Sequence, residues 1–410
     1  MVIDRHTIIN TKHINMKKVA LIFSANLSNP TGSSAIIRNF ADSRAIFKKK
    51  GVELSIYSPD FENEEVEISV KKESEKGIYR KTAILVSNYG VNHAIGAVVR
   101  LYVRYKRSTI VKDYLKKNTK DDVVFFHELF TCYKYLKKRK NADAKVVLVL
   151  HNDGDTYKML RTEYKTLEKS VFYKYLERLE QYVLEKVDLI GFSADYPCKN
   201  FLDLHPKFDK NKMFYVYNGL TLDSTKIKMA NNSSDVYEIC CVGTVMERKG
   251  QRFIVEALHR MASAGTVPNI HFSIIGAGPL KNELEELSAK YGISKYITFC
   301  GSTSNVNKYL ENSDIFILPS ITEGFPIAIL EAMRLGLPIV STNVAGIPEM
   351  IKHEQTGLII EPSVEGVYSF LSNFEKYDWK HMGKHSHELF LEKFTTEKMM
   401  ESYSDVLKSV

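Results

Sequence analysis

Short apolar runs alternate with amphipathic stretches along almost the whole 410-residue chain, and no other feature constrains the fold as much. Each run has the length of one β-strand, and the stretches between the runs have the apolar spacing of helices. Such alternation predicts parallel sheets covered by helices. The expected strands form two series: first Val19–Ser24, Glu53–Tyr57, Ala83–Val86, Val123–His127, Val146–His151, Leu189–Ser193 and Phe214–Tyr217, then Glu238–Gly243, Ile270–Gly276, Ile297–Cys300, Ile315–Pro319, Pro338–Ser341 and Gly357–Ile360.

Two series of strands predict two Rossmann-like, doubly wound α/β domains, and the chain is long enough for both. The boundary is expected within residues 218–235, which are polar and rich in Asn and Ser. We therefore expect a first domain over 16–218, a second over 219–377 and closing helices over 378–410. Residues 1–15 are polar and unpatterned, which favours a disordered extension. The expected helices include Ser33–Lys50, Asn92–Lys117, Thr156–Lys186, Gly250–Met261, Leu280–Tyr291 and Ile327–Leu335.

Cysteine usage and hydropathy indicate the compartment. The five cysteines are an odd number without metal-binding spacing, which favours a reducing, cytoplasmic environment. Two lysines precede an apolar run that begins after Met16, but the run is too short for a signal peptide and is expected to be the first strand. No stretch reaches the roughly 18 apolar residues that span a bilayer.

The charge is distributed unevenly between the two halves. Residues 1–220 carry a net charge of +13 and residues 221–410 a net charge of −5. Two basic runs stand out in the first half, Arg100–Lys117 and Lys134–Lys140. They are either solvated helix faces or a surface that attracts anionic lipid headgroups or a phosphorylated acceptor. Nucleic acid is not an expected partner, because no binding motif accompanies the charge.

The segment SITEGFPIAILEAM, residues 320–333, joins a strand to a helix and contains two glutamates eight residues apart. Gly324 allows close approach of a ligand, and Pro326 suits the first turn of a helix whose free N–H groups attract anions. Glu331 lies inside the apolar helix, where an ionised carboxylate requires a partner. That partner is either Arg334, three residues on, or the hydroxyls of a sugar or ribose.

Three further turns have the composition of phosphate-binding loops. VGTVMERKG places Arg248 and Lys249 after the strand that ends at Gly243. These adjacent cations either bind a diphosphate, for which their charges are suited, or form a solvated basic turn. IIGAGPL has glycines at a strand end but lacks the full dinucleotide spacing. SNPTGSS contains Gly32, which is either a phosphate-facing residue or a plain turn glycine.

Two neighbouring strands of the first domain end in histidine. His127 is followed by Glu128, and His151 is followed by Asn152. Both histidines are expected at the edge of the sheet where ligands bind, or else in structural roles. Asp153 and Asp155 have the spacing of a metal clamp, but the cationic turn makes a metal unnecessary, so no metal site is expected.

Together these motifs resemble those of the family 4 glycosyltransferases, which are retaining enzymes of the GT-B fold. The most specific match is EGFPIAILEAMRLGLPIVSTNVAGIPEMI, which contains the family's E-x7-E pattern, with Lys249 and Gly250 at the right distance upstream. HE at 127–128, YNG at 217–219 and GAGP at 276–279 are also similar. The resemblance extends from Met16 to the end. It implies two Rossmann-like domains that face each other across a cleft, with the C-terminal helix crossing back to the first domain.

The resemblance also implies roles for individual residues. Glu331 would hold the ribose of a nucleotide-sugar donor, Glu323 the donor sugar, and Lys249 the diphosphate. Many members carry Arg where this chain has Thr244, and Arg248 is expected to supply that charge. The other implied positions are Gly243, Gly324, Phe325 and Gly32 around the donor, His127 where donor and acceptor meet, and His151, Asn152 and Glu128 toward the acceptor.

The implied reaction is transfer of a sugar, with retention of anomeric configuration, from a UDP-type donor to a glycan or lipid-linked acceptor. No cofactor or essential metal is implied; the protein would act in the cytoplasm or on the cytoplasmic face of a membrane, in surface polysaccharide synthesis. Two alternatives remain. A different GT-B enzyme, such as a phosphorylase or epimerase, has no matching motif here. A catalytically inactive subunit that binds a glycan or a partner is supported only by Thr244.

Overall fold

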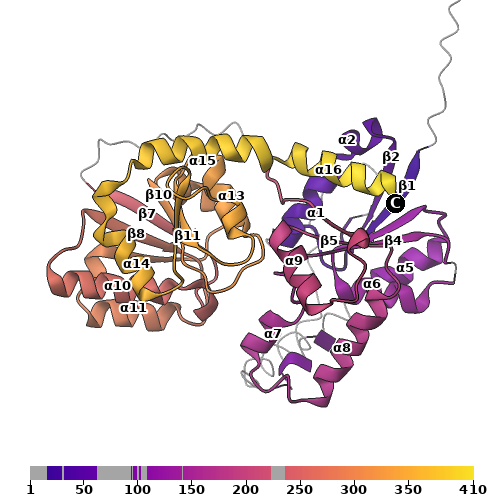
Figure 1. The fold of residues 1–410 in the computed structure, drawn as a ribbon, viewed down its shortest axis with the longest axis horizontal. Helices are drawn as coiled ribbons and strands as arrows, with labels where there is room; N and C mark the ends of the chain where they lie inside the picture. Colours follow the sequence, from indigo (N-terminus) through magenta and orange to yellow (C-terminus); the bar gives the residue numbers. More distant parts are fainter. Residues whose placement is uncertain are drawn as a thin grey trace, which may run out of the picture.

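The structure is a computed structural model that describes residues 16–29, 32–61, 94, 96–98, 101–102, 109–140, 142–222 and 236–410. Two α/β units lie side by side and are linked by the C-terminal helices (Figure 1). The expected extension 1–15, the strand Ala83–Val86, much of the helix Asn92–Lys117 and most of the boundary segment 218–235 lie outside these residues.

The first unit is built on a parallel sheet with the strand order β2-β1-β3-β4-β5-β6. Its central strands are almost entirely buried because helices cover both faces, as expected for a doubly wound sheet, whereas the edge strand β6 is partly exposed. The strands are β1 Lys17–Ile22, β2 Val52–Tyr57, β3 Val123–Phe126, β4 Lys145–Leu150, β5 Leu189–Phe192 and β6 Met213–Tyr215. The helices are α1 Gly32–Asp42, α2 Arg44–Lys49, α5 Ile110–Lys117, α6 Leu129–Lys138, α7 Lys158–Glu163, α8 Val171–Leu184, α9 Asp195–Leu204 and the 3-10 turn η1 Lys210–Lys212.

Two expected helices of this unit are each divided in two. The segment Ser33–Lys50 breaks at Ser43 into α1 and α2. The segment Thr156–Lys186 forms α7 and α8, because the Ser170 hydroxyl accepts a 3.2 Å hydrogen bond from the Tyr173 amide and so begins a new helix.

The second unit has the strand order β12-β11-β10-β7-β8-β9, again parallel throughout. The strands are β7 Tyr237–Val242, β8 Ile270–Ile275, β9 Ile297–Gly301, β10 Ile315–Leu318, β11 Ile339–Thr342 and β12 Gly357–Ile360. The helices are α10 Gln251–Ala264, α11 Lys281–Lys290, α12 Val306–Glu311, α13 Ile327–Arg334 and α14 Val364–Ser372, with 3-10 turns η2 Glu247–Lys249, η3 Ser294–Tyr296, η4 Ile347–Glu349 and η5 Phe374–Lys376.

Strand order reverses between β1 and β3 in the first sheet and between β7 and β10 in the second. Ligands of doubly wound sheets bind beyond the carboxyl ends of the strands at such reversals. We therefore expect the binding region of the second unit at the loops after β7 and β10. These loops carry the cationic turn and the first of the paired glutamates.

The last two helices connect the units. Helix α15 (Trp379–Lys393) packs on α13 of the second unit, and α16 (Thr396–Ser409) packs on α2 of the first (Figure 1). Between them the chain runs beside the linker from the first unit: the Thr396 amide donates to the Leu220 carbonyl and the Leu220 amide to the Phe394 carbonyl, each at 3.0 Å. This arrangement confirms the predicted fold, including the helix that crosses back.

Candidate active site between the two units

The turn after β7 is held against the end of β10. Gly250 has a φ of +73°, and a Cβ atom there would lie 1.9 Å from the Pro319 carbonyl oxygen, so only glycine fits. The Ile321 amide donates a 2.8 Å hydrogen bond to the Arg248 carbonyl. Two turns that are about 70 residues apart in sequence are thus fixed side by side.

Three of the predicted charged residues meet at this point. The Lys249 ammonium donates to Glu323 Oε1, and the Ser320 hydroxyl donates to the same oxygen at 2.8 Å. Arg248 Nη1 lies 3.7 Å from Glu323 Oε2 and donates to the Thr322 carbonyl at 3.4 Å. Two cations therefore share one carboxylate, and all three side chains are at most 18% exposed. The cluster keeps an excess positive charge, as an anion site requires.

Glu331 lies on α13 and is half-buried among apolar neighbours. Burial raises the pKa of its carboxyl, and the charge of Arg334 only partly offsets this. Within the described chain Glu331 forms no hydrogen bond or ion pair. The Arg334 guanidinium instead donates to the Thr221 carbonyl and to Asn307 Oδ1, each at 3.1 Å. The local salt bridge offered as an alternative is therefore wrong.

Gly324 and Phe325 lie where the second unit meets the first. A Cβ atom on Gly324 would lie 3.3 Å from the backbone of Asn152, which follows β4. The Phe325 ring stacks on Tyr217 with centroids 5.4 Å apart and meets Phe394 edge-on at 5.7 Å. The Phe325 side chain thus belongs to the junction between the units.

The backbone of Thr244, at the position where the resemblance implies arginine, is held by a hydrogen bond. Its carbonyl accepts a 3.2 Å hydrogen bond from the buried Gln251 amide group, whose oxygen accepts from the Met246 amide at 3.4 Å. A Cβ atom on the neighbouring Gly243 would lie 3.7 Å from Lys249 Cε. The Lys249 stem therefore passes over Gly243, directly beside Thr244.

The two histidines form a stacked pair. His127 Nδ1 and His151 Nε2 are 2.8 Å apart, and the ring planes differ by 15°. Burial lowers the pKa of both, that of His151 to about 4, so both are neutral at pH 7. Phe40 and Phe125 pack against His127, which is 5% exposed, whereas His151 is half-buried. Of the two histidines, for which the sequence left both a ligand-facing and a structural role open, the structure buries His127 more deeply.

Glu128 and Gly32 lie around the first loop of the chain. Glu128 Oε2 accepts hydrogen bonds from the Ser24 amide at 2.8 Å and from the Thr131 hydroxyl at 2.9 Å, so this carboxylate anchors the loop after β1. Gly32 begins α1, and the preceding residues 30 and 31 lie outside the described chain.

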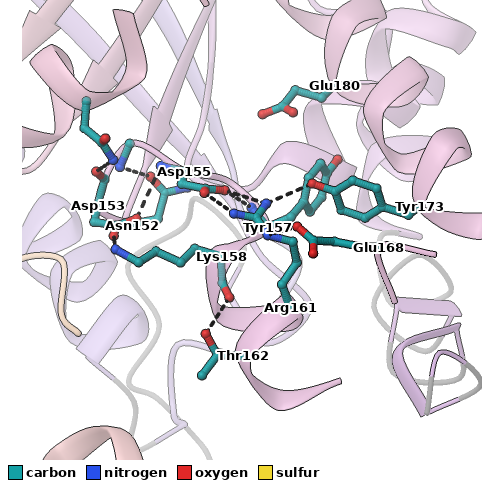
Figure 2. Close-up of polar contacts among 12 residues, drawn as sticks. Asn152, Asp153, Asp155, Tyr157, Lys158, Arg161, Thr162, Glu168, Tyr173 and Glu180 are labelled. Atoms are coloured by element: carbon teal, nitrogen blue, oxygen red, sulfur yellow. Dashed lines mark hydrogen bonds and ion pairs between the residues drawn. The ribbon is translucent and has the colours of Figure 1, made fainter. Parts of the chain in front are cut away.

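Figure 2 shows how the loop after β4 is fixed by charge. Asp153 pairs with Lys158 at 2.6 Å, and Asp155 pairs with Arg161. Arg161 also donates to the Tyr173 hydroxyl at 2.8 Å and lies 3.0 Å from Glu168. Both aspartates of the possible metal clamp are thus bound by cations. Both ion pairs lie in the loop that contains Asn152, whose backbone faces Gly324.

Sequence reasoning missed one cross-unit contact. Glu349, at the end of η4, accepts hydrogen bonds from two amides of the first unit and from the Tyr217 hydroxyl. The only signal was the segment GIPEM, in which a glutamate follows a turn. Nothing in its local pattern indicates that the partner lies some 150 residues earlier.

Comparison with known sequences identifies the second unit. Residues 223–378 match the family Glycosyl transferases group 1. The second unit is therefore similar to group 1 glycosyl transferases, in agreement with the resemblance at the level of the family. An uncharacterized glycosyltransferase of Haemophilus influenzae is 30% identical over 208 residues, covering 49% of this chain and 56% of that protein. A UDP-Gal:alpha-D-GlcNAc-diphosphoundecaprenol alpha-1,3-galactosyltransferase of Escherichia coli is 30% identical over 165 residues, covering 37% and 42%.

The matched region spans 36–56% of the length of the first four curated relatives. Solved structures match far more of the chain. The Anabaena protein HepE in complex with UDP has a TM-score of 0.65 at 13% identity and covers 96% of this chain and 100% of its own. Sucrose-phosphate synthase from Thermosynechococcus elongatus has a TM-score of 0.67 at 15% identity, with the same coverage. These likenesses confirm the GT-B fold.

Proposed function

We propose that the protein is a retaining glycosyltransferase of family 4 that transfers a sugar from a UDP-linked donor to a glycan or lipid-linked acceptor during surface polysaccharide or glycoconjugate synthesis. The observation that carries this proposal is the cluster of Arg248, Lys249 and Glu323 beyond the ends of β7 and β10. Glu323 lies in the loop that leads into α13, and α13 carries Glu331, which has no hydrogen-bond or ion-pair partner among the described residues.

The cluster supplies the groups that donor binding needs. A diphosphate is a stronger partner for Lys249 and Arg248 than one shared carboxylate, because it carries more charge and more acceptor oxygens. Its arrival would free Glu323 to accept hydrogen bonds from sugar hydroxyls. The ribose hydroxyls would donate to Glu331, whose carboxylate is otherwise unpaired among the described residues. The same cations would stabilise the leaving diphosphate as its charge develops.

The comparisons support the same assignment. Group 1 membership of residues 223–378 favours glycosyl transfer, and the structurally similar HepE binds UDP. The Escherichia coli relative acts on a diphosphoundecaprenol-linked sugar, which supports a lipid-linked acceptor on the cytoplasmic face of a membrane. Thr244 still favours the alternative of an inactive binding subunit. Arg248 weakens this alternative, because its guanidinium lies in the cluster and can supply the positive charge that Thr244 lacks.

Contact with an anionic membrane is supported by one end of the first unit. Val98, Tyr102, Met159, Val171 and Tyr175 are 37–86% exposed there, and we call this set the apolar tip. The amide of Ala94, just before Val98, donates to Thr166 between α7 and α8, which brings these segments together. Exposed cations flank them, namely Lys165, Lys169, Lys174 and Arg178. Exposed apolar groups among cations favour insertion into the headgroup region. The described residues contain no helix that is long and apolar enough to cross a bilayer.

The proposal is tested by incubating the protein with a panel of nucleotide sugars and membrane lipid extract and measuring released nucleoside diphosphate. We expect release from at least one UDP-sugar, unchanged by EDTA. Lys249→Gln should lower the rate at least about a hundredfold, because it removes the charge that stabilises the leaving group. Glu375→Ala, at an exposed site away from the cluster, is the control and should match the wild type.

Three results would count against parts of this account. Absence of release from every donor by a folded protein would favour the inactive subunit. Strict metal dependence would contradict the assignment of the diphosphate to Arg248 and Lys249 alone. Release with inversion of the anomeric centre would remove the retaining assignment.

A further inference from the structure

Glu349 forms a bidentate contact from the second unit to a helix of the first. Its Oε2 accepts from the Asp195 amide at 3.0 Å and its Oε1 from the Tyr196 amide at 2.8 Å. The Tyr217 hydroxyl, in the linker from the first unit, donates to Oε2 at 2.9 Å. One carboxylate thus receives three hydrogen bonds, all from residues that precede the second unit.

Helix α9 does not provide its own N-terminal cap. Its N-cap residue is Ala194, which has no side-chain acceptor, and no side-chain cap forms there. Pro197 in the first turn has no N–H. The first two amides of the helix are those of Asp195 and Tyr196, and both are satisfied by Glu349. A negative charge at this position also interacts favourably with the helix dipole.

The backbone next to Glu349 is shaped for the same contact. A Cβ atom on Gly346 would lie 2.9 Å from Ala194 Cβ across the interface and 2.9 Å from the Gly324 carbonyl oxygen. The Gly346 amide donates to that carbonyl at 3.1 Å. Ala345 adopts a left-handed φ of +48°, a conformation that costs a non-glycine residue free energy. The turn that holds Glu349 is therefore bonded to the loop that carries Glu323 and Gly324.

We propose that Glu349 is a positioning residue: by capping α9 across the interface, it latches the two units in the closed arrangement and places the donor cluster against Asn152 and His151. The effect of the latch on catalysis rests on the proposed function. The latch itself does not, because it consists only of contacts within the protein. When the latch opens, the cluster keeps its internal contacts but loses its position relative to the first unit. Donor binding should then persist while transfer fails.

Small-angle X-ray scattering tests the latch without any assay of activity. The wild type should scatter as the closed arrangement, and Glu349→Ala should have a larger radius of gyration. Glu349→Gln should be intermediate, because it keeps one acceptor oxygen and loses the charge. We expect a shift of about tenfold in the closed-to-open ratio for Glu349→Ala, the scale of one charge-assisted hydrogen bond. Glu375→Ala is the control and should scatter as the wild type.

A second variant opens the interface by another route. Gly346→Val inserts a side chain against Ala194 and should increase the radius of gyration even with Glu349 intact. Circular dichroism should show native secondary structure in each variant. In calorimetry with UDP, Glu349→Ala should keep the wild-type Kd, whereas its kcat with an active donor should fall about tenfold or more.

The proposal of a latch is wrong if Glu349→Ala scatters like the wild type. It is equally wrong if this variant has a lower melting temperature but an unchanged radius of gyration. It is also wrong if Gly346→Val opens the molecule and Glu349→Ala does not. These outcomes are separate from failure of the proposed function, which is shown by absence of nucleoside diphosphate release in the wild type.

Discussion

At the scale of single residues, Glu331 is the most informative side chain of this protein. A carboxylate in a half-buried, apolar setting is stable only with hydrogen-bond donors, and the described chain offers it none. Arg334, the one local candidate, donates elsewhere. We therefore expect the residue to lower the stability of the free protein, which is common for groups that are completed by a ligand.

Glu331→Gln should stabilise the free protein at pH 8. Burial raises the folded-state pKa of Glu331, so its unfavourable effect is absent at low pH and appears as the pH rises through that pKa. The variant lacks this titration, and its free energy of unfolding should exceed that of the wild type by on the order of 1 kcal/mol at pH 8, with a smaller difference at pH 5. Urea denaturation at both pH values measures the difference. A variant that is less stable than the wild type at pH 8 would show that Glu331 has an internal partner.

At the scale of elements, strand–turn–helix units carry the site, and their packing depends on a few glycines. Gly250 and Gly265 both have positive φ, near +70°, but their surroundings differ. Gly250 lies against the Pro319 carbonyl, whereas a Cβ atom on Gly265 would meet nothing within 4 Å. The first glycine joins two turns of the site, and the second only ends α10.

The two glycines make a matched pair of substitutions. Gly265→Ala should cost about 1 kcal/mol of the free energy of unfolding, the strain of a left-handed alanine alone. Gly250→Ala adds a collision with backbone and should cost at least about 3 kcal/mol, or displace Lys249 from Glu323. Chemical denaturation of both variants checks this, and equal losses would show that the turn after β7 is not held against β10.

The same elements show what the sequence can predict. The strands were predictable because each buried strand is a continuous apolar run. Glu323, Arg248 and Lys249 were predicted as site residues because ligands of this fold bind beyond the strand ends, and the structure brings their side chains together. The break between α7 and α8 was missed because it depends on the cap at Ser170. The sequence could not decide which histidine is the more buried, because Phe40, which packs on His127, comes from a distant helix. The contact of Glu349 with α9 was missed because it forms only when the two units meet.

At the scale of the whole molecule, the two units carry different surface and site features. The second unit holds the cationic cluster and Glu331, while the first unit carries the excess positive charge and the apolar tip. Part of the basic run 134–140 is not free for lipid, because Lys134 is buried. The tip is consequently a better candidate for membrane contact than the basic runs themselves.

Binding to vesicles that contain anionic lipid should depend on the apolar tip. Val171→Asp and Tyr175→Asp should each weaken binding roughly tenfold or more. Each substitution removes an apolar side chain that would be buried in the membrane, and the new carboxylate is repelled by the anionic lipid. Leu391→Asp, at an apolar residue of α15 that is 40% exposed, is the control and should have no effect. Vesicle sedimentation at low and high salt measures this, and we expect binding to fall with salt. Equal binding by all four proteins would remove the tip as a membrane contact.

The most direct test of the central claim is calorimetric titration with UDP. The claim is that the loops after β7 and β10, together with α13, form a nucleoside-diphosphate site in which Glu331 accepts hydrogen bonds from the ribose. The wild type and Glu375→Ala should bind UDP with the same Kd, and Glu331→Ala should bind at least about tenfold more weakly while it remains folded. Absence of UDP binding by the wild type, or unchanged affinity in Glu331→Ala, would contradict the account.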